Sequence, residues 1–389
     1  MVTSIPGSGA PWPNCTPEIG RRTAFRTPMS QQIAAKLNSL TLGLNIPVSV
    51  TIELTRRCPL ACRHCYLPET RGRSGPAREL DTVQWEKILG QLAEAGGLYL
   101  VFTGGEPLLR PDLPRLCRRA KELKFDVRVF STGLGLKREK ALELKEAGVS
   151  GFEISFYGRP ALHDSVTGRK GSFKASLSAA RLLKRSGLAV KIKVPLMKIN
   201  SGQAGWLQKL AKKEGFEISF DPVITAANDG NAAALPLRLT GPKLAKAVKL
   251  LSSPPDPRSP IPDSPVSRPP TPDSRSFNDF LCGAGRNICA VGPGGELYSC
   301  LQVPVKLGDL KRRKFADIWR NSAWLRKWRR AGIKDLKDCA GCGDIAFCSR
   351  CPGISMLEAG DVFAPNKPAC EMAGILRQAN VSKVLKIAP

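Results

Sequence analysis

The sequence predicts an α/β protein whose main domain is built from six β–α units. Between Val48 and about Ser252, short β-branched or apolar runs alternate with amphipathic stretches that have the 3.6-residue periodicity of helices. Continuous β–α alternation implies parallel strands. Six units fit either an open doubly wound sheet or a partial barrel, and in both architectures ligands gather at the carboxyl ends of the strands.

The N-terminal part is expected to carry little structure before the first strand. Residues 1–28 are rich in Pro, Gly, Ser and Thr and predict disorder, and "SQQIAAKLNSL" (30–40) predicts a helix, so 1–47 is read as an N-terminal extension. The first strand is expected at "VSVTIEL" (48–54). Asp81 is the expected N-cap of a helix that stops at Gly96 and has these apolar residues at helical spacing: Trp85, Ile88, Leu89, Leu92 and Ala93.

The remaining units repeat this pattern as far as residue 251, which closes the predicted domain 48–251. The next strand is expected at "LYLVF" (98–102), followed by a helix with one apolar face made of Leu113, Leu116, Cys117, Ala120 and Leu123. The other expected strands are "DVRVF", "GFEISF", "AVKIKVPL" and "FEISF", and the other expected helices are 137–147, 173–186, 203–214 and one that begins at Pro242.

A change of composition follows this domain. Residues 252–276 contain nine prolines and hardly an apolar side chain, which predicts an extended linker. Residues 277–389 are expected to form a second domain of cysteine-rich turns. Within it, Phe315, Ile318, Trp319 and Leu325 lie at helical spacing and are interpreted as core residues.

Charge and cysteine content limit the classes of function. The formal net charge is +27, but the basic residues are spread along all 389 residues without a nucleic-acid-binding motif, which indicates a solvated surface. There is no run of eighteen apolar residues and no secretion signal, so we expect a cytoplasmic protein with no membrane partner. Thirteen cysteines in a reducing compartment favour metal or cluster ligation over disulfides, and two histidines leave thiolate as the main ligand.

The first cysteine group is "CPLACRHC" (58–65), directly after the first predicted strand. Three thiolates, from Cys58, Cys62 and Cys65, can hold three irons of a four-iron cluster and leave the fourth iron free for a substrate or cofactor. A structural zinc site needs a fourth ligand, and only His64 stands close in sequence. The spacing therefore favours an incompletely ligated [4Fe-4S] cluster.

With "FTGGEP" (102–107) some forty residues later, "CPLACRHCY" resembles the radical S-adenosylmethionine (radical SAM) enzymes. The resemblance implies a partial (β/α)6 TIM-like barrel in place of the open sheet. It also implies reductive cleavage of S-adenosylmethionine to a 5′-deoxyadenosyl radical, which abstracts a hydrogen atom from the substrate. An electron donor such as ferredoxin or flavodoxin is implied as a partner.

The resemblance also implies residues that bind S-adenosylmethionine. Gly104 and Gly105 are expected where the backbone approaches the ligand, and Glu106 is expected to accept hydrogen bonds from the methionine ammonium. His64, before the third cysteine, is expected near the adenine. Ser155 and Glu153 of "EISFYG" (153–158) are the expected ribose or carboxylate contacts, although Thr167 stands where many relatives have an Arg.

Eight cysteines follow the linker: Cys282, Cys289, Cys300, Cys339, Cys342, Cys348, Cys351 and Cys370. By spacing alone they fit two four-iron clusters or two four-cysteine zinc sites. Their order resembles the SPASM domain of radical SAM enzymes, except that the last gap of "CAGCGDIAFCSRC" (339–351) is one residue short. The resemblance implies two auxiliary clusters, one held by Cys282, Cys289, Cys300 and Cys351 and the other by Cys339, Cys342, Cys348 and Cys370.

A SPASM-type domain implies a maturase that modifies a peptide or protein side chain. Relatives of the sulfatase-maturase type have an Asp as proton acceptor after the third auxiliary cysteine, where Leu301 stands here. The 47 residues before Val48 are too few for a leader-binding domain, so a separate recognition protein is expected to deliver the substrate. Two alternatives stay open: a radical SAM enzyme that modifies a tetrapyrrole or cofactor side chain, and a zinc-containing nucleic-acid-binding protein.

Overall fold

The computed structural model describes residues 29–67, 79–251, 282–336 and 338–385. The predicted disordered segment 1–28 and the predicted linker 252–276 lie outside the described residues. Within the described part, no helix combines the length and the apolarity needed to cross a membrane.

The fold is organised by one nine-stranded sheet with the order β6-β5-β4-β3-β2-β1-β7-β8-β9. The strands β1 to β7 pair in parallel, and β8 and β9 are added in antiparallel pairing. Their bounds are β1 Ser49–Thr55, β2 Tyr99–Gly104, β3 Asp126–Ser131, β4 Val149–Ser155, β5 Ala189–Pro195, β6 Glu217–Asp221, β7 Ile288–Val291, β8 Glu296–Tyr298 and β9 Lys306–Asp309.

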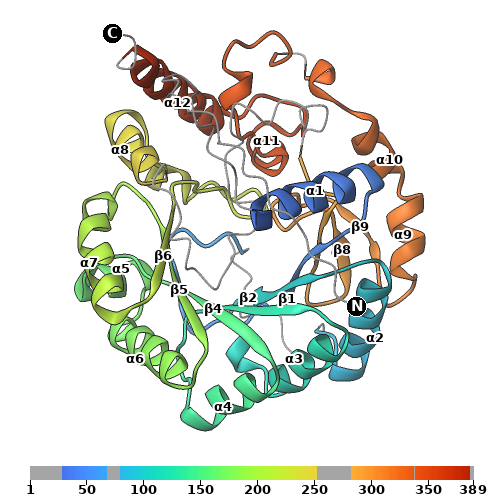
Figure 1. Ribbon diagram of the computed structural model, residues 1–389, viewed down its shortest axis with the longest axis vertical. Coiled ribbons are helices and arrows are strands. Elements are labelled where there is room, and N and C mark those ends of the chain that lie inside the picture. The colour runs from blue at the N-terminus through green and yellow to red at the C-terminus, as the bar shows by residue number, and fades with distance from the viewer. Residues whose placement is uncertain (1–28, 68–78, 252–281, 337, 386–389) are drawn as a thin grey trace, which may run out of the picture.

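Figure 1 shows the strands curving around one side of the molecule with helices along their outer face. These helices are α2 Thr82–Glu94, α3 Leu113–Glu122, α4 Arg138–Glu146, α5 Pro160–Thr167, α6 Ser172–Arg185 and α7 Ala204–Glu214. The other helices are α1 Met29–Leu44, α8 Gly241–Leu251, α9 Phe315–Asn321, α10 Ala323–Arg330, α11 Pro352–Ala359 and α12 Lys367–Leu385. The predicted six β–α units of a curved sheet are therefore confirmed.

The six predicted strands have two chemically different faces. In β1, Ile52 and Leu54 are fully buried toward the helices, while Glu53 between them points to the opposite, inner face. The same alternation places Glu153 on the inner face of β4, between buried Phe152 and Ile154. The inner face of the barrel is therefore polar, as an internal binding site requires.

Helix α2 begins where the sequence predicts. The Asp81 side chain accepts a hydrogen bond from the Gln84 N–H at 2.8 Å, and Gln84 Oε1 accepts one from the Asp81 N–H at 3.0 Å. This capping box satisfies donors that have no partner inside the helix. Its predicted apolar face lies in the core, with Trp85 and Leu89 fully buried.

The C-terminal segment does not fold as a unit separate from the barrel. Strand β7 pairs in parallel with β1, with Val50 opposite Cys289, so the barrel sheet continues into the cysteine-rich part. Trp319 in α9 donates a hydrogen bond from Nε1 to the Asn45 carbonyl at 2.8 Å, which ties the C-terminal segment to the residues before β1. Phe315, Ile318, Trp319 and Leu325 are buried, which confirms their predicted place in the core.

Candidate functional site

The first cysteine group lies in an irregular loop, residues 56–67, that leaves the carboxyl end of β1; we call it the cysteine loop. Its backbone is held by the end of α5, because Ala61 N–H donates to the Thr167 carbonyl at 2.9 Å and Arg63 N–H to the Val166 carbonyl at 3.0 Å. Thr167, which stands where many relatives have an Arg, is fully buried. It therefore supports the loop through its main chain.

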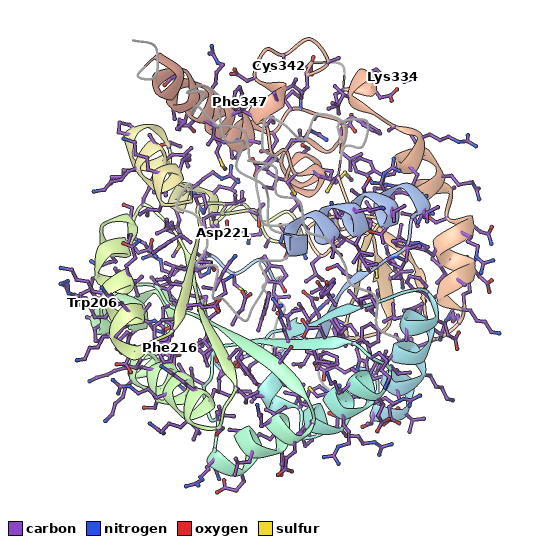
Figure 2. The ribbon with its side chains drawn as sticks, viewed as in Figure 1. Trp206, Phe216, Asp221, Lys334, Cys342 and Phe347 are labelled. Carbon is purple, nitrogen blue, oxygen red and sulfur yellow. The ribbon has the colours of Figure 1, made fainter. Side chains whose placement is uncertain are left out.

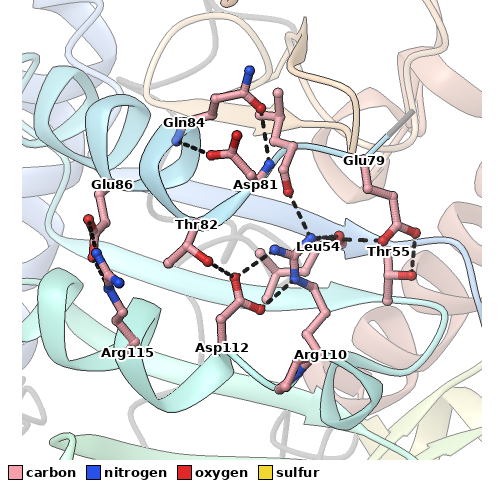
Figure 3. A network of polar contacts seen from close by, with 12 residues as sticks. Leu54, Thr55, Glu79, Asp81, Thr82, Gln84, Glu86, Arg110, Asp112 and Arg115 are labelled. Carbon is pink, nitrogen blue, oxygen red and sulfur yellow. Dashed lines mark hydrogen bonds and ion pairs between the residues drawn. The ribbon is translucent and has the colours of Figure 1, made fainter. Parts of the chain in front are cut away.

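A polar network fixes the end of β1 just before the loop (Figure 3). The buried Thr55 hydroxyl donates to Glu79 Oε1 at 2.6 Å and accepts from the Arg57 N–H at 3.0 Å. Arg110, 6% exposed, donates to the Leu54 carbonyl at 3.4 Å and forms an ion pair of 2.7 Å with Asp112. Charge-assisted contacts of this kind restrict where the cysteine loop can begin.

The two glycines of "FTGGEP" are required by backbone packing. Gly105 N–H donates to the Thr55 carbonyl at 2.7 Å, and Glu106 N–H donates to the Arg57 carbonyl at 2.8 Å. A Cβ atom at Gly104 would lie 2.3 Å from the Thr55 oxygen, and one at Gly105 would lie 2.1 Å from the Arg57 oxygen. The glycines let the end of β2 pack directly on the start of the cysteine loop, and their predicted approach to S-adenosylmethionine stays a prediction.

Gly105→Ala is expected to push the cysteine loop away from β2, because the new methyl group would clash with the Arg57 carbonyl, a backbone group that cannot rotate away as a side chain can. We expect the variant to lose roughly a third of its iron, the share of one cluster in three, together with its S-adenosylmethionine cleavage. The matched control is Gly90→Ala in α2, where nothing lies within 4 Å of the added Cβ. Iron analysis and 5′-deoxyadenosine assays of both variants test this, and an unchanged Gly105→Ala enzyme would contradict it.

Glu106 is completely buried, and its carboxylate already accepts several hydrogen bonds. Oε1 accepts from Leu108 N–H at 3.0 Å and Ser131 Oγ at 2.8 Å, and Oε2 accepts from Thr132 N–H at 2.7 Å and from the Thr132 hydroxyl. Burial raises the pKa of Glu106, and these hydrogen bonds act in the opposite direction. The side chain thus ties the end of β2 to the end of β3, and its contact with a methionine ammonium stays a prediction.

His64 is half-buried and lies against Tyr157, with ring centroids 5.0 Å apart in an edge-on arrangement. Burial lowers the pKa of His64 to about 4, so the ring is neutral at ordinary pH. Tyr157 also hydrogen-bonds to Cys62 and to Ser155. Sequence reasoning missed Tyr157 as part of the site, although it belongs to the "EISFYG" segment.

Ser155 and Glu153 lie on the inner face of β4, as their alternation with buried residues predicts. In the register with β5, Glu153 lies opposite Lys191 and Ser155 opposite Lys193. Lys193 in turn forms an ion pair of 3.6 Å with Asp221 at the end of β6. Figure 2 shows Asp221 at this end of β6, with Phe216 near the other end of the strand. Cofactor binding by Ser155 and Glu153 stays a prediction.

The inner cysteine set comprises Cys282, Cys289, Cys300 and Cys351. Cys289 is part of β7 and fully buried, and Cys300 follows β8 by two residues. Cys300 interacts electrostatically with Cys282 and Cys351, and Cys289 interacts with Cys300. Burial raises the pKa of Cys282 to about 11 and that of Cys300 to about 12. These thiols are therefore grouped; Cys289 is fully buried, and the other three are partly exposed.

The outer cysteine set comprises Cys339, Cys342, Cys348 and Cys370. Cys339 interacts electrostatically with Cys370 and Cys342, and Cys348 interacts with Cys370. Cys342 is exposed and lies near the outer edge of the C-terminal segment (Figure 2). The assignment of these two sets of thiols to two clusters stays a prediction.

Arg350, the residue before Cys351 in the shortened gap, lies between the two sets. Its guanidinium interacts electrostatically with Cys282 and Cys351 of the inner set and with Cys339 and Cys348 of the outer set. Nη2 donates to the backbone carbonyls of Val362 at 2.6 Å and Ala364 at 2.8 Å, which fixes the side chain. In the sequence, the only sign that this position is unusual is the short gap of two residues between Cys348 and Cys351.

The donor chemistry fits iron–sulfur clusters. Within the described ranges, no three His, Cys, Asp or Glu side chains lie close enough to hold one metal ion. A four-iron cluster is wider than a single ion and takes its thiolates from further apart. Three thiols in the cysteine loop and two sets of four thiols, all without competing disulfides, are the donor sets that such clusters need.

Two family models match the chain. The model of the radical SAM superfamily matches residues 52–203, and that of the SPASM iron–sulfur cluster-binding domain matches residues 282–352. Among curated relatives, the PqqA peptide cyclase of Bradyrhizobium diazoefficiens is 28% identical over 353 residues, covering 87% of this chain and 90% of the relative. The PqqA peptide cyclase of Rhodopseudomonas palustris is also 28% identical, with the same coverage.

Solved structures share the fold at low sequence identity. SuiB of Streptococcus suis bound to the precursor peptide SuiA has a TM-score of 0.60 and 16% identity, covering 92% of this chain and 84% of that chain. Native anSMEcpe with bound AdoMet has a TM-score of 0.63 and 14% identity, covering 88% of this chain and 99% of that chain. Both agree with the partial barrel that is extended by a cysteine-rich segment.

Proposed function

Because this chain is a radical SAM enzyme with a SPASM iron–sulfur domain, we propose that it modifies a side chain of a ribosomally made peptide. The relatives that align over most of both chains are peptide cyclases, and a structural neighbour binds a precursor peptide. The expected reaction classes are crosslinking, oxidation or epimerisation of a residue in the peptide.

The observation that carries this proposal is that both cysteine-bearing parts are built on β1. The cysteine loop leaves the carboxyl end of β1, and β7, which contains Cys289, pairs with the same strand. Cys289 lies opposite Val50 near the start of β1. Leu301, next to Cys300, is tied to the cysteine loop through Asn228, whose Nδ2 donates to the Leu301 carbonyl at 3.1 Å and whose N–H donates to the Tyr66 carbonyl at 2.8 Å. The inner cysteine set is therefore joined to the barrel and is not part of a distant unit. Such an arrangement lets one bound substrate face both the radical site and an electron acceptor.

Specific residues would hold the cofactors. Cys58, Cys62 and Cys65 would supply thiolates to the first cluster, and His64, Tyr157 and the ends of β2 and β4 would contact S-adenosylmethionine. When bound, these cofactors supply a 5′-deoxyadenosyl radical that takes a hydrogen atom from the substrate. The neutral His64 ring and the buried Tyr157 exclude water from this place.

Co-expression with short peptides encoded near the gene, if the genome carries them, or otherwise with candidate precursor peptides, tests the proposal. Cells grown without oxygen should yield a peptide whose mass has changed or, for an epimerisation, one that has taken up deuterium from heavy water. The matched control is the same co-expression with Cys58→Ala. An unmodified peptide, recovered with an enzyme that holds its iron and cleaves S-adenosylmethionine, would count against a peptide substrate.

The partners and the location belong to the same proposal. A separate recognition protein is the proposed carrier of the substrate. Ferredoxin or flavodoxin is the proposed electron donor, and the cytoplasm is the proposed location. A pull-down of the tagged enzyme from its own cells, with and without the peptide, identifies such a recognition protein.

A further inference from the structure

A cavity of about 120 Å³ lies where the end of β1 meets the cysteine-rich segment. Its wall includes Glu53 from β1, Arg56 from the cysteine loop, Asn228 from the segment after β6, Tyr298 from β8, and Leu301 next to Cys300. The cavity therefore touches the barrel, the cysteine loop and the neighbourhood of the inner cysteine set. It has room for a single side chain of modest size.

Glu53 is the acidic residue in this wall. It is 4% exposed, and the Tyr66 hydroxyl donates to its Oε1 at 2.7 Å. Tyr66 directly follows Cys65 and also hydrogen-bonds to Thr103 at the end of β2. A chain of hydroxyl groups thus holds the Glu53 carboxylate in a fixed place beside the radical site.

Two other polar atoms of the wall have no partner among the described residues. Arg56 Nε is buried without an acceptor, and Asn228 Oδ1 is buried without a donor. The rest of Asn228 is held firmly, since its Nδ2 donates to the Leu301 carbonyl at 3.1 Å and its N–H donates to the Tyr66 carbonyl at 2.8 Å. Buried polar atoms normally have partners, so the cavity is suited to a guest with a donor and an acceptor, such as a peptide amide.

We propose that Glu53 is the proton acceptor of the reaction, acting on the substrate group that enters this cavity. The inference rests on the proposed function and narrows it to a net oxidation, because an epimerisation needs no proton acceptor of this kind. Among the other groups in the wall, Asn228 and Leu301 do not titrate. Burial raises the pKa of the Tyr298 phenol, which therefore stays neutral.

The proton balance of such an oxidation is simple. The substrate loses two hydrogens: one leaves as a hydrogen atom to the 5′-deoxyadenosyl radical, and the other leaves as a proton to Glu53 and an electron to an iron–sulfur acceptor. The bond that forms is a double bond or a crosslink in the peptide. Glu53 becomes neutral and later returns the proton to water.

The surroundings suit Glu53 to this exchange. Burial is the largest influence and raises its pKa, and the negative charge of Glu296 on β8 raises it further. The Tyr66 hydrogen bond and the positive charge of Arg56 lower it. The net effect is a raised pKa, so Glu53 is a stronger base than an ordinary surface carboxylate.

The first test uses the peptide-free, cluster-loaded enzyme and infrared spectroscopy. Difference spectra across a pH titration should show the carbonyl band of a neutral carboxylic acid at a pH above the ordinary glutamate range, and the band should disappear in Glu53→Gln. Glu296→Gln removes a negative charge that raises the pKa of Glu53. In this variant the carbonyl band should persist, and the pH at which it disappears should be lower. No Glu53-dependent band at any pH at which the enzyme stays folded would overturn the proposal.

The second test measures product. With the co-expressed peptide, Glu53→Gln should form product about a hundredfold more slowly, the range expected for loss of an acid–base group, while 5′-deoxyadenosine is still released. Glu86→Gln, which removes a carboxylate paired with Arg115 on the outer helices, is the matched control. Leu301 lines the same cavity, so Leu301→Asp in the Glu53→Gln enzyme should restore part of the product.

The outcomes separate this inference from the function it rests on. Wild-type product formation by Glu53→Gln would overturn it, and so would loss of 5′-deoxyadenosine together with the product, because Glu53 would then act on the cofactor site. If circular dichroism shows that Glu53→Gln does not fold, Glu53→Asp is used instead. A Glu53→Asp enzyme whose rate of product formation depends on pH as in the wild type would overturn the proposal. A wild-type enzyme that leaves every peptide unmodified would overturn the proposed function. The infrared titration would then still show whether Glu53 binds a proton above the ordinary glutamate range.

Discussion

Replacing Cys58, Cys62 and Cys65 together with Ala is expected to abolish S-adenosylmethionine cleavage completely. The variant should also lose roughly a third of the iron, since three four-iron clusters hold roughly twelve irons and the eight thiols of the other two sets stay in place. The cysteine loop should keep its path, because it is held by main-chain hydrogen bonds from Ala61 and Arg63 to the end of α5. Iron analysis and chromatography of 5′-deoxyadenosine measure both effects.

Cys117→Ala is the matched control for this change. Cys117 is fully buried in α3 among core residues and belongs to none of the three cysteine groups. Its loss should lower the free energy of unfolding and leave iron content and cleavage unchanged. Cleavage of S-adenosylmethionine that survives the triple change would refute the radical assignment, since no other described cysteine lies in the cysteine loop.

Cys342→Ala should separate cofactor cleavage from product formation. Cys342 is exposed on a loop near the outer edge of the molecule and lies outside the nine-stranded sheet. Its loss should remove one of the four thiolate ligands of the outer cluster without disturbing β7, which joins the C-terminal segment to β1. We therefore expect 5′-deoxyadenosine to form slowly and modified peptide to be absent, because the electron left by an oxidation loses its acceptor.

The control for Cys342→Ala is Ser349→Ala in the same cysteine-rich loop, which removes no thiol and should leave product formation intact. Both products are quantified side by side after circular dichroism has shown that each variant is folded. Wild-type amounts of modified peptide from a folded Cys342→Ala enzyme that lacks the outer cluster would contradict an essential role in electron transfer. The outer set would then serve to stabilise the C-terminal segment.

Much of the fold follows from local patterns that the sequence displays directly. The 3.6-residue spacing of Trp85, Ile88 and Leu92 predicts α2 and its buried face, and the capping residue Asp81 predicts where the helix begins. The run "VSVTIEL" (48–54) predicts the first strand, which the structure has at Ser49–Thr55. These predictions succeed because the periods of helix and strand are properties of the backbone itself.

The residue types of the site could also be predicted, but their packing could not. Cysteine spacing indicates the clusters because thiolate is the ligand that iron–sulfur clusters need. The sequence does not show that Gly105 packs on the Arg57 carbonyl, that Glu106 is surrounded by donors from β3, or that Tyr157 reaches Cys62. Each of these contacts joins segments whose separation in the chain hides them from any local pattern.

By itself, the sequence determined the β–α order and the three cysteine groups, since each depends on residue type and short-range spacing. Only the tertiary structure decided that β7 pairs with β1 and that Glu53, Asn228 and Leu301 share one cavity. The physical reason is that strand pairing and burial are settled by the free energy of contacts across the whole chain. Val50 and Cys289 become neighbours only when the barrel sheet accepts the C-terminal segment at its free edge.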